Sequence, residues 1–208
     1  MIPLAGLPGG RLAAGLGVQT LVMVGAGAAM WVYSGRGLDT FVDLGWRPVA
    51  QGLIFGLILI VVIAAIFRLF PGFLEKTARL QARMAALFAR EPNGAAFVGI
   101  AICAGIGEEA AFRGGLQTLA GDAIGPVAGI AISALAFALI HMARPLITAI
   151  ILLIGVVFGL VFWWTGSLLT VMIGHAVYDV WALRVLHREL GRLGYLDDPD
   201  TPKTEPAV

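Results

Sequence analysis

Charge is scarce in this chain. Only 13% of its 208 residues are Asp, Glu, Lys or Arg, against about 25% in a soluble domain, whereas 59% are hydrophobic and the mean hydropathy is +0.92. Neither sign dominates, because 14 Lys and Arg stand against 13 Asp and Glu, so the basic footprint of a nucleic-acid-binding protein is missing. The single cysteine, Cys103, permits neither an internal disulfide nor a thiolate metal site. These absences argue against a water-soluble enzyme and indicate a membrane protein without a nucleic-acid partner.

Long apolar runs, by contrast, are abundant. A helix needs about 20 mostly apolar residues to cross roughly 30 Å of hydrocarbon, and six segments approach that length. They are residues 12–35, 49–67, 95–119, 123–140, 145–164 and 168–186. The turn signal Thr165-Gly166-Ser167 separates the last two. The sequence therefore predicts an all-α, polytopic membrane bundle of about six transmembrane helices.

The remaining segments complete a division of the chain into four parts. Residues 1–70 hold two membrane helices, and residues 95–190 a four-helix catalytic core. Between them, residues 71–94 place apolar side chains at helical spacing among basic ones, which predicts an amphipathic helix on the membrane surface. Residues 191–208 are proline-rich towards the end, without apolar periodicity, and are expected to form a disordered cytoplasmic tail.

The basic residues predict the orientation. Eleven of the 14 Lys and Arg fall in the N-terminus, the second loop, the fourth loop and the tail, two fall in the loops between, and Arg113 lies within a membrane segment. Lys and Arg near span ends are retained in the cytoplasm. We therefore expect a multi-pass protein of the cell (inner) membrane, with both termini cytoplasmic and the lipid bilayer as its surroundings.

Six ionisable residues stand out within the apolar segments or directly at the end of one. Each costs about 3 kcal/mol at the centre of a membrane helix unless it is paired or hydrated, so each needs an explanation. They are Glu108, Glu109, Arg113, His141, His175 and Asp179.

The helical period predicts different surroundings for the two glutamates. Neighbouring positions differ by about 100° around the axis, so we expect Glu108 and Glu109 to face different points. Arg113 lies four residues after Glu109, the spacing of an acid–base pair, which predicts a structural role for both. Glu108 has Phe112 at that spacing and is left as an unpaired carboxylate suited to general-base work.

The histidines extend this set. His175 and Asp179 share one helix face, and His141 ends the fourth span. One histidine alone is more often a core residue bonded to a carbonyl, but the whole group suits water activation, metal binding or proton relay. On straight helices His141 falls near the cytoplasmic surface and Glu108 near mid-membrane, which predicts a water-open cavity in the cytoplasmic half.

Three motifs carry a family resemblance. GEEAAFRGGLQ around Glu108, FALIH ending at His141 and HAVYD from His175 to Asp179 resemble, in order and spacing, those of the CAAX protease and bacteriocin-processing (CPBP) intramembrane proteases. This group includes the type II CAAX prenyl endopeptidases. The resemblance covers roughly residues 95–187. It implies hydrolysis of a peptide bond in a membrane-associated or lipidated peptide. The partner that it implies is therefore a peptide or protein substrate, prenylated or not.

The resemblance also implies roles. Glu108 with His141 would activate a water, His175 and Asp179 would stabilise the oxyanion, and Glu109 with Arg113 would support the helix. Many members carry Asn where Asp179 stands, and an ionised Asp cannot donate a hydrogen bond. Asp179 must therefore be protonated, orient His175 or bind a metal.

Cofactor and function alternatives stay open at this stage. Glu108, His141 and His175 are candidate zinc ligands, although a glutamate base needs no metal, so no cofactor is certain. A non-catalytic or immunity-type family member and a proton-coupled transporter are the competing hypotheses. The transporter would require inverted repeats, and the sequence has none. Substrate identity and oligomeric state do not follow from the sequence.

Overall fold

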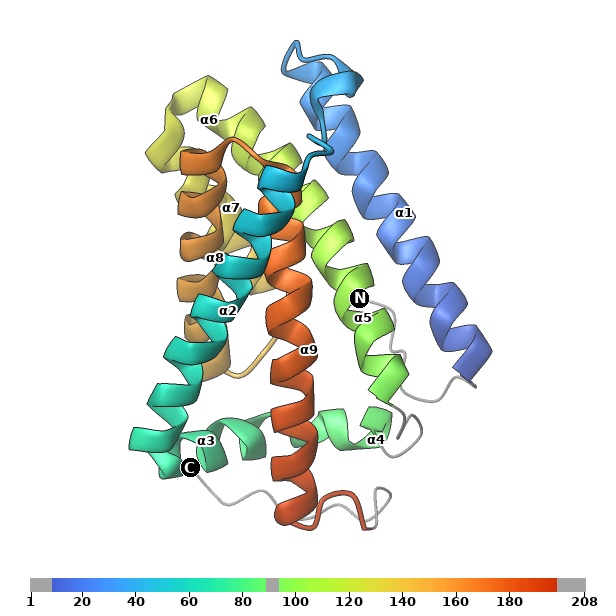
Figure 1. Ribbon diagram of the computed structural model, residues 1–208, viewed down its shortest axis with the longest axis vertical. Helices are drawn as coiled ribbons and strands as arrows, with labels where there is room; N and C mark the ends of the chain where they lie inside the picture. Colours follow the sequence, from blue (N-terminus) through green and yellow to red (C-terminus); the bar gives the residue numbers. More distant parts are fainter. Residues whose placement is uncertain (1–8, 89–93, 198–208) are drawn as a thin grey trace.

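The computed structural model describes residues 9–88 and 94–197, which are almost entirely helical and contain no strand (Figure 1). In chain order, the elements are α1 (Gly9–Tyr33), the short 3₁₀ turn η1 (Leu38–Thr40), α2 (Trp46–Leu69), α3 (Pro71–Leu80), the 3₁₀ turn η2 (Ala82–Met84), α4 (Ala85–Phe88), α5 (Gly94–Glu109), the π-helical segment η3 (Ala110–Gln117), α6 (Thr118–Ile124), α7 (Pro126–Ile140), α8 (Pro145–Thr165) and α9 (Leu168–Arg192).

Five helices of the described part are long and apolar enough to cross a bilayer. They are α1, α2, the continuous helix formed by α5, η3 and α6, and then α8 and α9. The predicted all-helical polytopic bundle is confirmed, and these helices indicate a multi-pass membrane protein.

The fourth predicted segment, residues 123–140, forms a shorter helix than expected. Gly125 adopts φ +97°, a conformation that ends α6, and Pro126 then occupies the first turn of α7. The helix begins at Pro126 instead of residue 123 and has 15 residues, or about 22 Å at 1.5 Å per residue. Its C-terminal end, capped by His141, therefore stops short of the distance that a full span covers.

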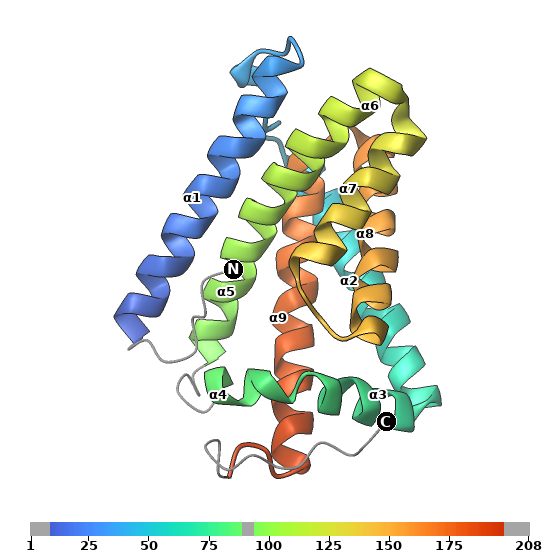
Figure 2. The ribbon, with the colours of Figure 1, turned by 180° about the vertical axis from the view of Figure 1, so that it is seen from behind.

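With the short α7 included, successive helices of the bundle run alternately in opposite directions, so the beginning of α1 and the end of α9 lie at the same end (Figures 1 and 2). α3 and α4 cross the bundle at that end. Exposed aromatic side chains mark the opposite end: Tyr33, Trp46, Trp163 and Trp164. Such residues concentrate where a membrane meets water, so this ring is consistent with an interface there.

Helix α9 lies between α2 and α5 (Figure 1), and glycines allow the close approach. A Cβ on Gly52 or Gly56 of α2 would lie 2.7 Å from the Thr170 carbonyl oxygen or 2.9 Å from that of Gly174. A Cβ on Gly105 of α5 would lie 2.8 Å from the α9 backbone. Small residues drive membrane helix packing in this way because backbones can then touch. The packing sets the position of α9 against α5, on which the candidate site depends.

The π-helical segment η3 interrupts the helix directly after Glu109. Its wider turns leave carbonyls for other donors: the Ser133 hydroxyl donates to the Phe112 carbonyl at 2.8 Å, and the Thr118 hydroxyl to the Arg113 carbonyl at 3.0 Å. Gly27 of α1 packs directly on the Ala110 carbonyl, where no Cβ would fit. Such π segments are rare and frequent at functional sites.

The segment between α2 and α5 is helical as far as it is described. Glu75 of α3 accepts hydrogen bonds from Arg79 at 2.8 Å and from Arg192 of α9 at 2.9 Å, and these bonds lower the pKa of the Glu75 carboxyl. That this segment lies on the membrane surface stays a prediction.

The first residues of the predicted disordered tail are part of the folded chain. Residues 191–192 still belong to α9, and Leu193, Tyr195 and Leu196 pack against the buried cluster around Phe88 and Leu190. These apolar contacts place the chain as far as Leu196 in the folded part. The rest of the predicted tail, 198–208, lies outside the described residues.

Candidate active site

His175 is the centre of the site, because three carboxylates surround its ring. Its Nδ1 lies 2.7 Å from Oε1 of Glu109, and its Nε2 lies 3.4 Å from Oδ2 of Asp179 and 3.8 Å from Oε2 of Glu108. A carboxylate accepts, so Nδ1–H donates to Glu109. Nε2 is thereby the nitrogen that faces Glu108 and Asp179, the two acids nearer to solvent.

Glu108 and Glu109 were expected to face different points, but both approach the imidazole of His175. Their directions do diverge, as neighbouring helical positions must. The His175 ring lies between them, however, and presents Nδ1 to Glu109 and Nε2 to Glu108. An imidazole has a polar atom on two edges, so residues pointing apart can contact the same ring.

The predicted pair of Glu109 and Arg113 is present and fully buried. Arg113 NH1 lies 3.1 Å from Oε1 of Glu109, with 1% and 0% of the two side chains exposed. The guanidinium also lies 4.6 Å from the ring centre of Phe137 and 5.5 Å from that of Phe158. The same Glu109 oxygen thus serves both Arg113 and His175, which gives Glu109 a part in placing the histidine that the sequence does not reveal.

A second connection joins the π-helical segment to α8. Arg113 NH2 donates to the Gly155 carbonyl at 3.1 Å, and one helical turn on Gln117 Nε2 donates to the Gly159 carbonyl at 2.9 Å. A Cβ on Gly159 would lie 2.8 Å from Oε1 of Gln117. The Gly155-x-x-x-Gly159 pattern therefore opens two backbone carbonyls of α8 to side chains of η3.

His141 is fixed at the end of α7. Its Nδ1 lies 2.7 Å from the Phe137 carbonyl oxygen, and its ring packs edge-on against that of Phe137 at 4.7 Å. A carbonyl only accepts, so Nδ1 carries the proton and Nε2 of the neutral ring remains an acceptor. His141 is near enough to Glu108 for the two side chains to interact electrostatically. The short α7 explains this proximity, since a full-length span would carry His141 further away along the bundle.

The exposed fractions divide the acids of the site into accessible and buried ones. The side chains of Glu108 and Asp179 are 17% and 26% exposed, whereas that of Glu109 is 0% exposed. Water can reach the first two carboxylates and is kept from the third. The arrangement thus separates two accessible acids from a buried acid–base pair, which suits hydrolysis of a bond by an activated water.

A three-ligand metal site does not form from the candidates Glu108, His141 and His175. Across residues 9–88 and 94–197, no three His, Cys, Asp or Glu side chains are grouped as metal ligands. Glu109 holds Nδ1 of His175 and the Phe137 carbonyl holds Nδ1 of His141, which leaves Nε2 as the free ring nitrogen of both side chains.

Sequence reasoning missed Phe158 and Gln117. Phe158 is 1% exposed and packs its ring on His175 at 5.2 Å as well as on Arg113. Nothing in the sequence singles out this phenylalanine among 11. Gln117 has a signal in retrospect, because it is a polar residue four positions after Arg113 in an apolar segment.

Comparison with known protein families bears on this site. Residues 91–181, which carry all six ionisable residues, match the family model described as type II CAAX prenyl endopeptidase Rce1-like. Residues 91–181 are thus similar to the CAAX protease family. No curated protein and no solved structure matches the chain. CAAX proteases are endopeptidases, so the family indicates a hydrolase acting on peptide bonds, and α1 and α2 lie outside the matched segment.

Proposed function

We propose that this protein is an intramembrane endopeptidase that hydrolyses a peptide bond of a membrane-associated or lipidated peptide. One observation carries the proposal: within the segment that matches the CAAX protease family, two accessible carboxylates, Glu108 and Asp179, face Nε2 of one buried histidine. A prenylated C-terminal peptide is the substrate class that the family description favours.

Glu108 is the general base in this proposal. It takes a proton from a water molecule, and the resulting hydroxide attacks the carbonyl carbon of the scissile bond. His141 assists, because its Nδ1–H is held by the Phe137 carbonyl and its Nε2 is left to accept from the same water. The proton held by Glu108 then passes to the leaving amine, as microscopic reversibility of acid–base catalysis requires.

His175 stabilises the negative oxygen of the tetrahedral intermediate by donating from Nε2. Its Nδ1–H is fixed on Glu109, so a doubly protonated ring directs its second N–H towards the reacting carbonyl. Asp179, 3.4 Å from Nε2, holds that proton in place until the oxyanion forms. Donors aimed in advance at developing charge usually supply the largest single contribution to catalysis.

The orientation follows from the charge pattern. The end of the bundle crossed by α3 faces the cytoplasm of the cell (inner) membrane, and both termini lie on that side. His141 stands at the end of α7 nearest to it, so substrate peptides enter the site from the cytoplasmic half of the membrane.

The test is cleavage of a peptide library by the purified chain in detergent, compared with Glu108→Ala. We expect the variant to lose about 10²–10⁴-fold in rate, the range for a positioned general base. Asp43→Ala removes an exposed carboxylate outside the site and should cleave as the wild type does. Equal rates for Glu108→Ala and wild type would overturn the assignment of the base.

Two further arms separate the competing hypotheses. An intact chain that binds peptides without cleaving any of them would indicate a non-catalytic, immunity-type protein. Proton flux across vesicles that depends on Glu108, without cleavage, would indicate a transporter. Loss of cleavage after chelator treatment, with recovery on adding zinc, would replace the metal-independent mechanism by a zinc-dependent one.

A further inference from the structure

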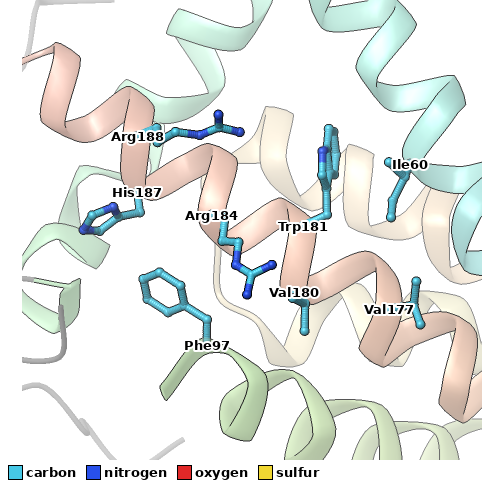
Figure 3. A pocket seen from close by; sticks show the side chains of 8 residues that line it. All are labelled: Ile60, Phe97, Val177, Val180, Trp181, Arg184, His187 and Arg188. Atoms are coloured by element: carbon cyan, nitrogen blue, oxygen red, sulfur yellow. The ribbon is translucent and has the colours of Figure 1, made fainter. Parts of the chain in front are cut away.

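A groove opens on the side of α9 that faces away from the candidate site. Its volume is about 550 Å³, within the range of small-molecule sites. Six of its lining side chains belong to α9, with Ile60 of α2 and Phe97 of α5 on the two sides (Figure 3). None of the six ionisable site residues lines it.

Helical geometry separates the groove from the site. Two residues along a helix differ by about 200° around its axis, so Val177 points nearly opposite to His175, and Trp181 nearly opposite to Asp179. The groove thus lies on the outer side of the bundle, where a membrane helix meets lipid.

The groove is apolar at one end and basic at the other. Ile60, Val177 and Val180 make one end apolar, and Arg184 and Arg188 follow one to three turns later, beside Trp181. Both arginines are exposed, and within the described residues neither forms an ion pair with an acidic side chain. The charged end is the end of the bundle that α3 crosses (Figure 1). Its arginines and the indole of Trp181 have the composition of a membrane–water boundary.

We propose that this groove binds one anionic phospholipid of the surrounding bilayer. The acyl chain lies along the apolar end, and the headgroup phosphate pairs with Arg184 and Arg188. Arginine suits phosphate because its planar guanidinium can donate two parallel hydrogen bonds, and basic pockets between membrane helices on the cytoplasmic side bind anionic headgroups. The lipid would pack against α2, α5 and α9 together and so stabilise the position of α9, the helix that carries His175.

The experiment is native mass spectrometry of the full chain in detergent, with phosphatidylglycerol or phosphatidylcholine added at equal concentration. We expect one retained phosphatidylglycerol, and at least about 10-fold weaker retention of phosphatidylcholine. Arg184→Gln with Arg188→Gln should weaken phosphatidylglycerol retention by about 10-fold or more, since each arginine contributes separately. The matched control is Arg47→Gln with Arg68→Gln, which removes two exposed charges outside the groove and should leave retention unchanged.

A second variant tests the apolar end. Val180→Trp fills the groove while leaving both arginines in place, and it should also expel the lipid. Equal retention of the two lipids, or an equal loss in the control variant, would overturn the proposal. So would displacement of phosphatidylglycerol by water-soluble glycerol phosphate, which has no acyl chain, or by a prenylated peptide, which would make the groove a substrate site. Glu108→Ala should bind lipid as the wild type does, so this result is independent of the proposed activity.

Discussion

At the scale of single residues, the three acids around His175 differ in burial and in their partners. Glu109 is buried and shared between His175 and Arg113, while Glu108 and Asp179 are partly exposed. Burial of a charge is tolerated only where a partner and hydrogen bonds compensate it, which accounts for the guanidinium beside Glu109. The two accessible acids are the ones that water can reach.

The buried pair should show strong coupling. Glu109→Gln and Arg113→Gln should each cost about 3–5 kcal/mol, because each leaves an uncompensated buried charge. The double variant should cost less than the sum of the two, since it removes both charges. The measurement is thermal unfolding in detergent across the four proteins of a double-mutant cycle. Strict additivity would show that the two side chains do not interact directly.

Asp179 should tolerate conversion to asparagine. The Asn oxygen can still accept from His175, and its amide can donate to an oxyanion, which an ionised carboxylate cannot. We expect Asp179→Asn to cleave at least as fast as the wild type, and Asp179→Leu to lose about 100-fold, because the oxyanion donor Nε2–H of His175 is then no longer held in place. The rate of peptide cleavage measures both. An equal loss in the two variants would mean that the reaction needs the negative charge of Asp179.

At the scale of elements, glycines decide how closely the helices approach the site. Gly27 lets α1 lie directly on the π-helical segment, and Gly159 leaves room for Gln117. Both contacts support η3, whose first residue follows Glu109. The position of Glu109 therefore depends on α1 and α8, which carry none of the six ionisable site residues.

Two glycines of α1 provide a matched comparison. Gly27→Ala should destabilise the fold by about 1–3 kcal/mol, because the new methyl group overlaps the Ala110 carbonyl. Gly25→Ala, two residues earlier, meets nothing within 4 Å and should be neutral or stabilise by up to about 1 kcal/mol through helix propensity. Thermal unfolding in detergent measures both changes. A similar effect of the two substitutions would remove the steric explanation.

At the scale of the whole molecule, the alternating helices place the ends of α2 and α9 on one side and the turn at Gly125 on the other (Figures 1 and 2). Combined with the eleven-to-two bias of basic residues, this geometry makes a definite prediction. Reporters fused after Arg90 and after Lys203 should read out in the cytoplasm, and one inserted at Gly125 should read out on the opposite side. An opposite-side signal at Arg90 or Lys203 would contradict the proposed orientation.

The sequence by itself determined the helical membrane bundle, most helix boundaries and the Glu109–Arg113 pair. Each follows from local rules: apolar length fixes a span, and a four-residue spacing brings two side chains onto one helix face. The three motifs, read together, also indicated the family. Gly125 and Pro126, which shorten α7, also form a break signal, although the predicted segment 123–140 ran across it.

Only the tertiary structure decided which residues meet. Glu109 and His175 are 66 positions apart, and their contact depends on how far glycines let α5 and α9 approach, which no local pattern encodes. The nearness of His141 to Glu108 depends likewise on where the short α7 ends relative to its neighbours. Contacts within one helix are set by the geometry of the backbone, whereas contacts between helices are set by the volumes of all the side chains packed between them.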